Sequence, residues 1–104
     1  MELTIEMRPK PGKLQELCQT LQAILPTIRK RPGCRECRIS LEEEVLSLWS
    51  DWKTEAGVER YIRSTNGAAL LGAIDVLSAE AAVRTDRGSP PEGIDVLKRM
   101  RKRR

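Results

Sequence analysis

Apolar and polar residues alternate in several stretches of the chain, and this period of two residues predicts β-strands with one apolar and one mixed face. Residues 1–7 alternate in this way. Residues 31–53 open with a Pro-Gly turn and hold two more alternating runs, which predict a hairpin with three glutamates at its tip, residues 42–44. Because adjacent glutamates make a poor tight turn, we expect a bulge or a basic neighbour there. Residues 79–85 predict a last strand.

Between these strands, apolar residues recur every three or four positions, which predicts amphipathic helices lying on one side of a sheet. The first helix covers residues 14–28, and Pro26 inside it predicts a kink or a break near Leu25. A second helical region follows the hairpin. Residues 65–67, Thr-Asn-Gly, are expected to interrupt it, and a further helical piece carries apolar residues inward as far as Leu77.

The predicted order is strand, helix, strand, strand, helix, strand. This order is typical of an α+β, ferredoxin-like fold, in which a four-stranded antiparallel sheet carries its helices on one face. The residues expected to face the helices are Leu3, Ile5, Ile39, Leu46, Leu48 and Val83. The residues expected on the open face are Thr4, Glu6, Arg38, Ser40, Ser47, Trp49 and Arg84.

A lone tryptophan on the open face, Trp49, is typical of a subunit contact, because aromatic anchors and complementary charges mark interfaces. We therefore expect a homodimer in which Trp49, Arg38, Thr4 and Ser47 contribute to the interface. A chain of 104 residues buries only about two thirds of its unfolded surface when it folds alone, which also favours association.

The net charge of +4 is unevenly distributed. Residues 1–87 hold thirteen basic and thirteen acidic side chains, whereas residues 88–104 hold six and two, so the whole net charge lies in the last segment. We expect residues 1–87 to form one domain and residues 88–104 to form a basic tail that follows a Pro-rich linker. Three interpretations of the tail are open: a solvated extension, a segment that docks on a partner subunit, or a contact for an anionic partner such as RNA or lipid headgroups.

Several classes of protein are disfavoured. No apolar run approaches the ~20 residues of a membrane span, so we expect a cytoplasmic protein without a membrane partner. Cys34 and Cys37 form a C-x-x-C, yet residues three apart on a strand point to opposite faces, and with only Cys18 and no histidine beside them they predict neither a redox pair nor a metal site. An RNA-binding sheet needs two or three exposed aromatic residues, and Trp49 is only one.

Four runs of the sequence carry a family resemblance: KPGKLQEL, LPTIRKRPGC, LSLWSDWKTEAGVERYIRS and GAALLGAI. Over roughly residues 1–85 the chain resembles the antibiotic biosynthesis monooxygenase family of dimeric α+β barrel proteins. The resemblance implies a homodimer whose two sheets meet through their open faces. It also implies a substrate pocket in each subunit between the sheet and the helices. Members of the family include cofactor-free oxygenases of aromatic substrates and many proteins without a known role.

The resemblance implies site residues as well. Trp52 matches the family's tryptophan, and Tyr61 and Asn66 occupy positions where other members often carry histidine. The implied pocket is formed by Trp52, Tyr61, Asn66 and Leu48, and Tyr61 and Asn66 are the candidate catalytic residues. The implied activity is a cofactor-independent monooxygenation of a small aromatic, phenolic or quinol-like substrate. The absence of histidine disfavours the haem-degrading branch.

The alternative is a non-catalytic, ligand-binding or structural homodimer of the same fold. A closed apolar cavity beside Trp52 and Tyr61 favours the enzyme, whereas a packed interior favours the alternative.

Overall fold

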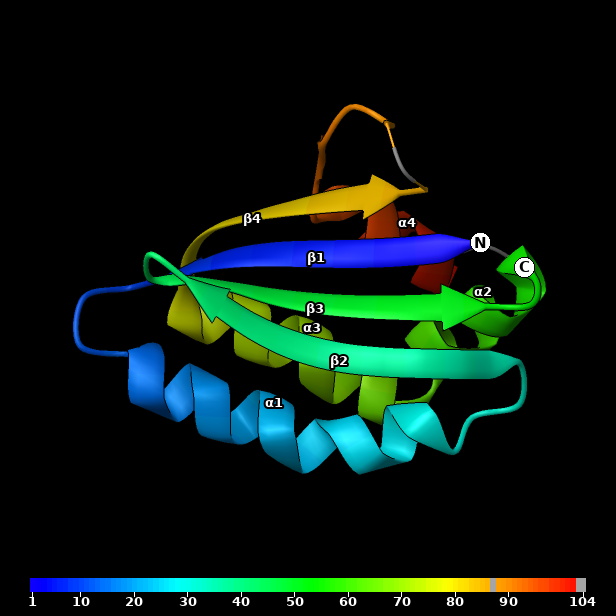
Figure 1. Ribbon diagram of the computed structural model, residues 1–104, viewed down its shortest axis with the longest axis horizontal. Coiled ribbons are helices and arrows are strands. Elements are labelled where there is room, and N and C mark those ends of the chain that lie inside the picture. The colour runs from blue at the N-terminus through cyan, green and yellow to red at the C-terminus, as the bar shows by residue number, and fades with distance from the viewer. Residues whose placement is uncertain (87, 103–104) are drawn as a thin grey trace.

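The computed structural model describes residues 1–86 and 88–102, and it forms a sheet with its helices on one face (Figure 1). The elements are β1 (Glu2–Pro9), α1 (Leu14–Arg29), β2 (Cys34–Glu42), β3 (Val45–Trp52), α2 (Glu55–Arg63), α3 (Thr65–Leu77), β4 (Ser78–Thr85), β5 (Glu92–Gly93) and α4 (Asp95–Lys102). The strand order is β2-β3-β1-β4-β5, and every neighbouring pair is antiparallel. The predicted α+β, ferredoxin-like fold is therefore confirmed. The prediction of four strands missed β5, because two residues are too few to show an alternation.

The register of the sheet places the predicted apolar residues in one layer. Ile5 of β1 lies between Leu48 of β3 and Val83 of β4, and Leu48 also pairs with Ile39 of β2. Ile5, Leu48 and Val83 are buried against the helices, and Ile39, on the edge strand, is half-buried. The apolar face of the sheet is thus the one predicted from the alternation.

The hairpin between β2 and β3 has a tight two-residue turn instead of a bulge, and Glu44 at its tip lines a shallow hollow together with two basic residues, Arg8 and Lys10. Glu42 pairs with Val45, and Glu43 and Glu44 between them have φ angles of 48° and 66°. Two successive residues in the left-handed region make the turn that suits the twist of a hairpin, although glutamate reaches this region less readily than glycine or asparagine. The register of the two strands therefore overrides the local preference of the tip.

One predicted helix break is absent and another lies elsewhere. The α1 helix runs on through Pro26 to Arg29 without a break, because its packing on the sheet outweighs the one backbone donor that proline lacks. The break between α2 and α3 falls at Ser64 instead of residues 65–67. Ser64 ends α2 through its backbone N–H and begins α3 by accepting a hydrogen bond from the Gly67 N–H on its side chain, at 3.1 Å.

Gly67 lies where the two helices approach most closely. A methyl group added at this position would stand 2.6 Å from the carbonyl oxygen of Ile62 and closer still to that of Tyr61, both backbone atoms. The corner between α2 and α3 therefore requires glycine at position 67.

Residues 92–102 are folded onto the same chain, which corrects the expectation of a solvated tail for this part. Leu97 and Met100 of α4 are buried in the common core. Both apolar residues lie on one side of a short helix, so docking buries them together. The domain boundary predicted at Arg87, and the basic pair at positions 103 and 104, lie outside the described residues.

Arginines hold α4 to α2 from both sides. The Arg101 guanidinium donates to the carbonyl oxygens of Ile62 and Ser64 at the end of α2, and Arg63 Nε donates to the Met100 carbonyl of α4 at 3.1 Å. Each arginine thus neutralises the negative end of the other helix. None of the helices in residues 1–86 and 88–102 combines the length and apolarity that a membrane crossing requires.

Candidate functional site

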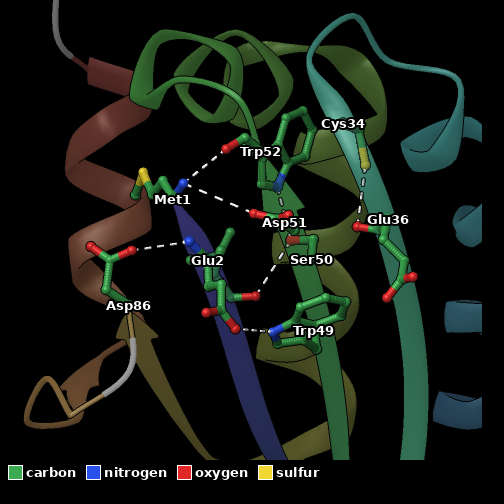
Figure 2. Close-up of polar contacts among 10 residues, drawn as sticks. Met1, Glu2, Cys34, Glu36, Trp49, Ser50, Asp51, Trp52 and Asp86 are labelled. Carbon is green, nitrogen blue, oxygen red and sulfur yellow. Dashed lines mark hydrogen bonds and ion pairs between the residues drawn. The ribbon is translucent and has the colours of Figure 1, made fainter.

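Trp52 and Tyr61 lie side by side between the sheet and the helices. Their ring centroids are 6.0 Å apart, and the side chains are only 1 % and 2 % exposed. The Trp52 indole N–H donates to Ser50 Oγ on the same strand at 2.8 Å (Figure 2). The indole therefore has its hydrogen-bond partner within its own strand.

Asn66 joins this group from the first turn of α3. The Tyr61 hydroxyl donates to Asn66 Oδ1 at 2.6 Å across the corner that Ser64 makes between the helices. Burial raises the pKa of Tyr61, the neighbouring Cys37 raises it further, and the guanidinium of Arg31 lowers it. The phenol is therefore neutral throughout the ordinary pH range and acts as a hydrogen-bond donor.

The predicted pocket residues are thus together, but the space between them is filled. Trp52 and Tyr61 are among the largest fully buried side chains, and Leu48 belongs to the same core cluster with 4 % of its surface exposed. The Tyr61 hydroxyl and the Trp52 N–H have partners inside the protein. This part of the molecule is a packed interior.

Arg31, which the sequence analysis did not select, stands close to this group. Its Nε is buried and has no hydrogen-bond partner among the described residues. A buried donor without a partner is costly, and the Arg31 charge is near enough to Tyr61 to lower the pKa of its phenol. In the sequence Arg31 follows two other cations at a helix end, and nothing in that position indicates that its Nε is buried.

Cys34 and Cys37 face the same side of the sheet, contrary to the prediction. Residue 35 is extra in the ladder, so Cys34 pairs with Trp52 and Cys37 with Ser50, two residues that both point inward. Burial raises the pKa of Cys37 to about 12 and also raises that of Cys34. Both thiols are therefore protonated near neutral pH, and neither is an activated nucleophile.

The open face of the sheet carries Trp49 near the middle of β3. Across the sheet, Trp49 lies between Arg38 of β2 and Thr4 of β1, and Thr4 in turn pairs with Arg84 of β4. The Arg38 guanidinium carbon lies 4.5 Å from the centre of the indole ring. The Trp49 N–H donates to a Glu2 carboxylate oxygen at 2.7 Å, as Figure 2 shows. Three of these five residues, Arg38, Arg84 and Glu2, are charged.

The hairpin end of the open face is acidic. A shallow hollow of about 300 Å³ is lined there by Glu6, Glu42 and Glu43, together with Ser40, Val45 and Ser47. Glu6 also accepts a hydrogen bond from Arg84 at 3.2 Å. Of the four predicted interface residues, Arg38, Trp49 and Thr4 lie in one row across the sheet. Ser47, two residues before Trp49 in β3, lines the acidic hollow instead.

Comparison with solved structures defines the fold. An antibiotic biosynthesis monooxygenase has a TM-score of 0.75 at 12 % identity, covering 86 % of this chain and 98 % of its own. The chain has the antibiotic biosynthesis monooxygenase fold. A protein of Bacteroides thetaiotaomicron, provisionally given the same name, has a TM-score of 0.74 at 14 % identity, covering 88 % and 90 %. A conserved protein of Methanosarcina mazei has a TM-score of 0.72 at 20 % identity, covering 83 % and 91 %.

These solved proteins share their fold with this chain, while the sequence identities are 20 % or less. No family model and no curated protein matches the sequence. Within residues 1–86 and 88–102, no group of three or more acidic, cysteine or histidine side chains is arranged to hold a metal ion.

Proposed function

We propose that this protein is a homodimer of the monooxygenase fold, formed through the open faces of two sheets, and that it serves as a ligand-binding or structural dimer without oxygenase activity. The observation that carries the dimer is the Trp49 row. A large indole, covered on its face by Arg38 and bonded at its N–H to Glu2, stands on a sheet face that no helix covers. Interfaces are enriched in such aromatic and arginine pairs.

The open face of the sheet carries both signs of charge, which suits a contact with a second copy of itself. In a two-fold contact the same face of each copy meets its counterpart, so that residue i of one copy contacts residue j of the other and j contacts i. Arg38, at the middle of β2, pairs with Glu36 at 3.1 Å, and Arg84 of β4 pairs with Glu6 at 3.2 Å. Carboxylates and guanidiniums thus alternate on this face, and each copy offers both charges to the other.

The packed interior supports the absence of oxygenase activity. Cofactor-free oxygenation requires a pocket that holds the substrate away from water, whereas Trp52, Tyr61 and Leu48 are buried in the core. Asn66 is half-buried, and its side-chain oxygen accepts from the Tyr61 hydroxyl. The purified protein should therefore consume no O₂ with a panel of simple phenols and hydroquinones. Uptake with any of them would refute this part of the proposal.

The second candidate function is the monooxygenase itself, which the neighbouring structures' names and the Arg31 donor beside Tyr61 favour. A phenolate or enolate held there would meet Arg31 Nε and the Tyr61–Asn66 pair, which supply the polar groups that an oxyanion needs. In this case O₂ uptake should fall at least tenfold, about 1.4 kcal/mol, in Arg31→Met. A matched control, Arg60→Met on the exposed side of α2, should keep its activity.

The dimer is tested separately through its interface. Trp49→Ala removes the aromatic anchor, and Arg38→Glu replaces the cation that lies over the indole with an anion beside Glu36. Both variants should dissociate at protein concentrations where the unaltered chain stays dimeric. Arg99→Glu, on an exposed position of α4, should not. Equal dissociation of all three variants would show that the open face is not the interface.

A further inference from the structure

A groove runs between α3 and α4 on the side of the molecule away from the open sheet face. Its volume is about 430 Å³. Ala68, Leu71 and Gly72 of α3 form an apolar floor, and Lys98, Arg101 and Lys102 of α4 form the rim together with Asp75. The groove thus combines a surface that favours apolar atoms with a margin that favours negative charge.

The rim keeps an excess of positive charge. Lys98 Nζ pairs with Asp75 Oδ1 at 3.0 Å, so those two charges compensate each other. The Arg101 guanidinium is fixed by backbone carbonyls, which hold it in place without neutralising it. Lys102 is exposed, and within the described residues it has no ion-pair partner. The groove therefore has a net charge of +2, which comes from Arg101 and Lys102.

The floor of the groove continues along α3 beyond the rim. A side chain added at Gly72 would meet no atom within 4 Å, so the surface is open at that point. One helical turn further on the same side of α3 lies Val76, which is 65 % exposed although it is a large apolar residue. From Ala68 to Val76 the apolar surface follows the axis of α3 for about 12 Å, at 1.5 Å per residue. An elongated apolar partner fits this surface better than a compact one.

Three other occupants fit less well. A bilayer would need the apolar side of α4, but Leu97 and Met100 are buried in the core. Single-stranded nucleic acid stacks on aromatic residues, and none lines the groove. A second copy of this chain would have to offer an acidic helix with an exposed apolar side, but the apolar side of α2, the helix with Glu55 and Glu59, is buried.

We propose that the α3–α4 groove binds an amphipathic helix of a partner protein, with its apolar side on Ala68, Gly72 and Val76 and its acidic side against Arg101 and Lys102. A helix laid in a groove is a common mode of peptide recognition, in which apolar anchors give affinity and the surrounding charges give specificity and rate. The site is on the helical side of the molecule, so it does not depend on the proposed dimer.

The test uses the full chain and a fluorescein-labelled synthetic peptide that forms a helix with leucine on one side and glutamate on the other. A peptide of the same composition with the leucines distributed around the helix is the control. The first peptide should bind, with fluorescence anisotropy rising as protein is added, and the permuted peptide should bind at least about tenfold more weakly. Added salt should weaken binding of the first peptide.

Two variants locate the binding site. Gly72→Gln fills the groove at an open helical position, and Lys102→Glu reverses a rim charge; each should weaken binding of the peptide at least about tenfold, or 1.4 kcal/mol. Arg99→Glu changes the same charge on α4 outside the groove and should leave the affinity within about twofold. Circular dichroism of all variants should match the unaltered chain, since the three positions are exposed.

Three results would overturn the proposal. Equal binding of the two peptides would show that the apolar side is not recognised. An unchanged affinity in Gly72→Gln would place binding outside the groove. Tighter binding to phosphatidylglycerol vesicles or to polyuridylate RNA, unaffected by Gly72→Gln, would show that α4 is a general basic surface.

Discussion

Replacing Gly67 by alanine should destabilise the protein, although alanine is the better helix former. The new methyl group would lie 2.6 Å from the Ile62 carbonyl oxygen, and nearer still to that of Tyr61, whereas ordinary contacts of this kind are longer than 3.0 Å. Both oxygens belong to the backbone, so α2 and α3 must move apart. Overpacking of this kind costs about 1–3 kcal/mol, and the helix propensity returns at most about 1 kcal/mol. We expect a net loss of about 1–2 kcal/mol.

Urea unfolding followed by circular dichroism measures this loss, and the same substitution elsewhere on the helix gives the control. Gly72→Ala adds its methyl group to open space, so it should raise the free energy of unfolding by about 0.5–1 kcal/mol. The two alanines should therefore shift stability in opposite directions, and Gly67→Ala should lower Tm by at least about 4 °C. Equal or increased stability of Gly67→Ala would refute the close approach at the Ser64 corner.

Three further outcomes are expected. Arg101→Ala removes the donor to the carbonyl oxygens at the end of α2, so it should lower the free energy of unfolding by about 1 kcal/mol. Amide hydrogen exchange in α4 should become faster, and exchange no faster than in the unaltered chain would contradict this. Burial keeps Cys37 and Tyr61 protonated in the folded state, whereas unfolding releases their protons at high pH. Their contribution to stability should therefore be constant below pH 9.0, the ordinary Cys37 value, and fall as the pH rises toward 12, by at most about 1.4 kcal/mol per pH unit per group. Cys37→Ala should show a shallower fall in urea titrations. Replacing Glu43 and Glu44 with Asn-Gly should raise the urea midpoint, by about 1 kcal/mol in stability, because both positions are left-handed; an unchanged midpoint would mean that the turn carries no strain.

The layer structure of this protein could be predicted from the sequence because it depends on periodic burial. The alternation around Ile5, Leu48 and Val83 places these residues correctly, since a slip of one residue would turn all of them to solvent. Threonine is a favoured capping residue, so the start of α2 at Thr54, whose side chain accepts from the Gly57 N–H, is also a feature that a sequence can show.

Features that depend on tertiary contacts could not be predicted. The extra residue at position 35 turns Cys34 and Cys37 to the same face, and no alternation within the strand indicates it. The tail was predicted from its charge, but its docking depends on Leu97 and Met100 finding space beside α2 and on arginines that pair with backbone carbonyls. Hydrogen bonds to carbonyls have no signature in the sequence.

The proximity of the candidate site residues could be predicted, but not the way in which they pack. The residues Trp52, Tyr61 and Asn66 lie together, yet their hydrogen bonds are made within the protein and their space is filled. Packing of this kind is decided by the volumes of many neighbours at once, so a resemblance in a few positions does not reveal it.

Sedimentation equilibrium of the purified full chain tests the central claim, that two copies associate through the sheet face carrying Trp49. We expect a mass twice the 11.8 kDa of one chain, and a return toward 11.8 kDa for Trp49→Ala at the same concentration. A mass of 11.8 kDa for the unaltered chain, at concentrations well above those of an ordinary stable dimer's dissociation constant, would contradict it.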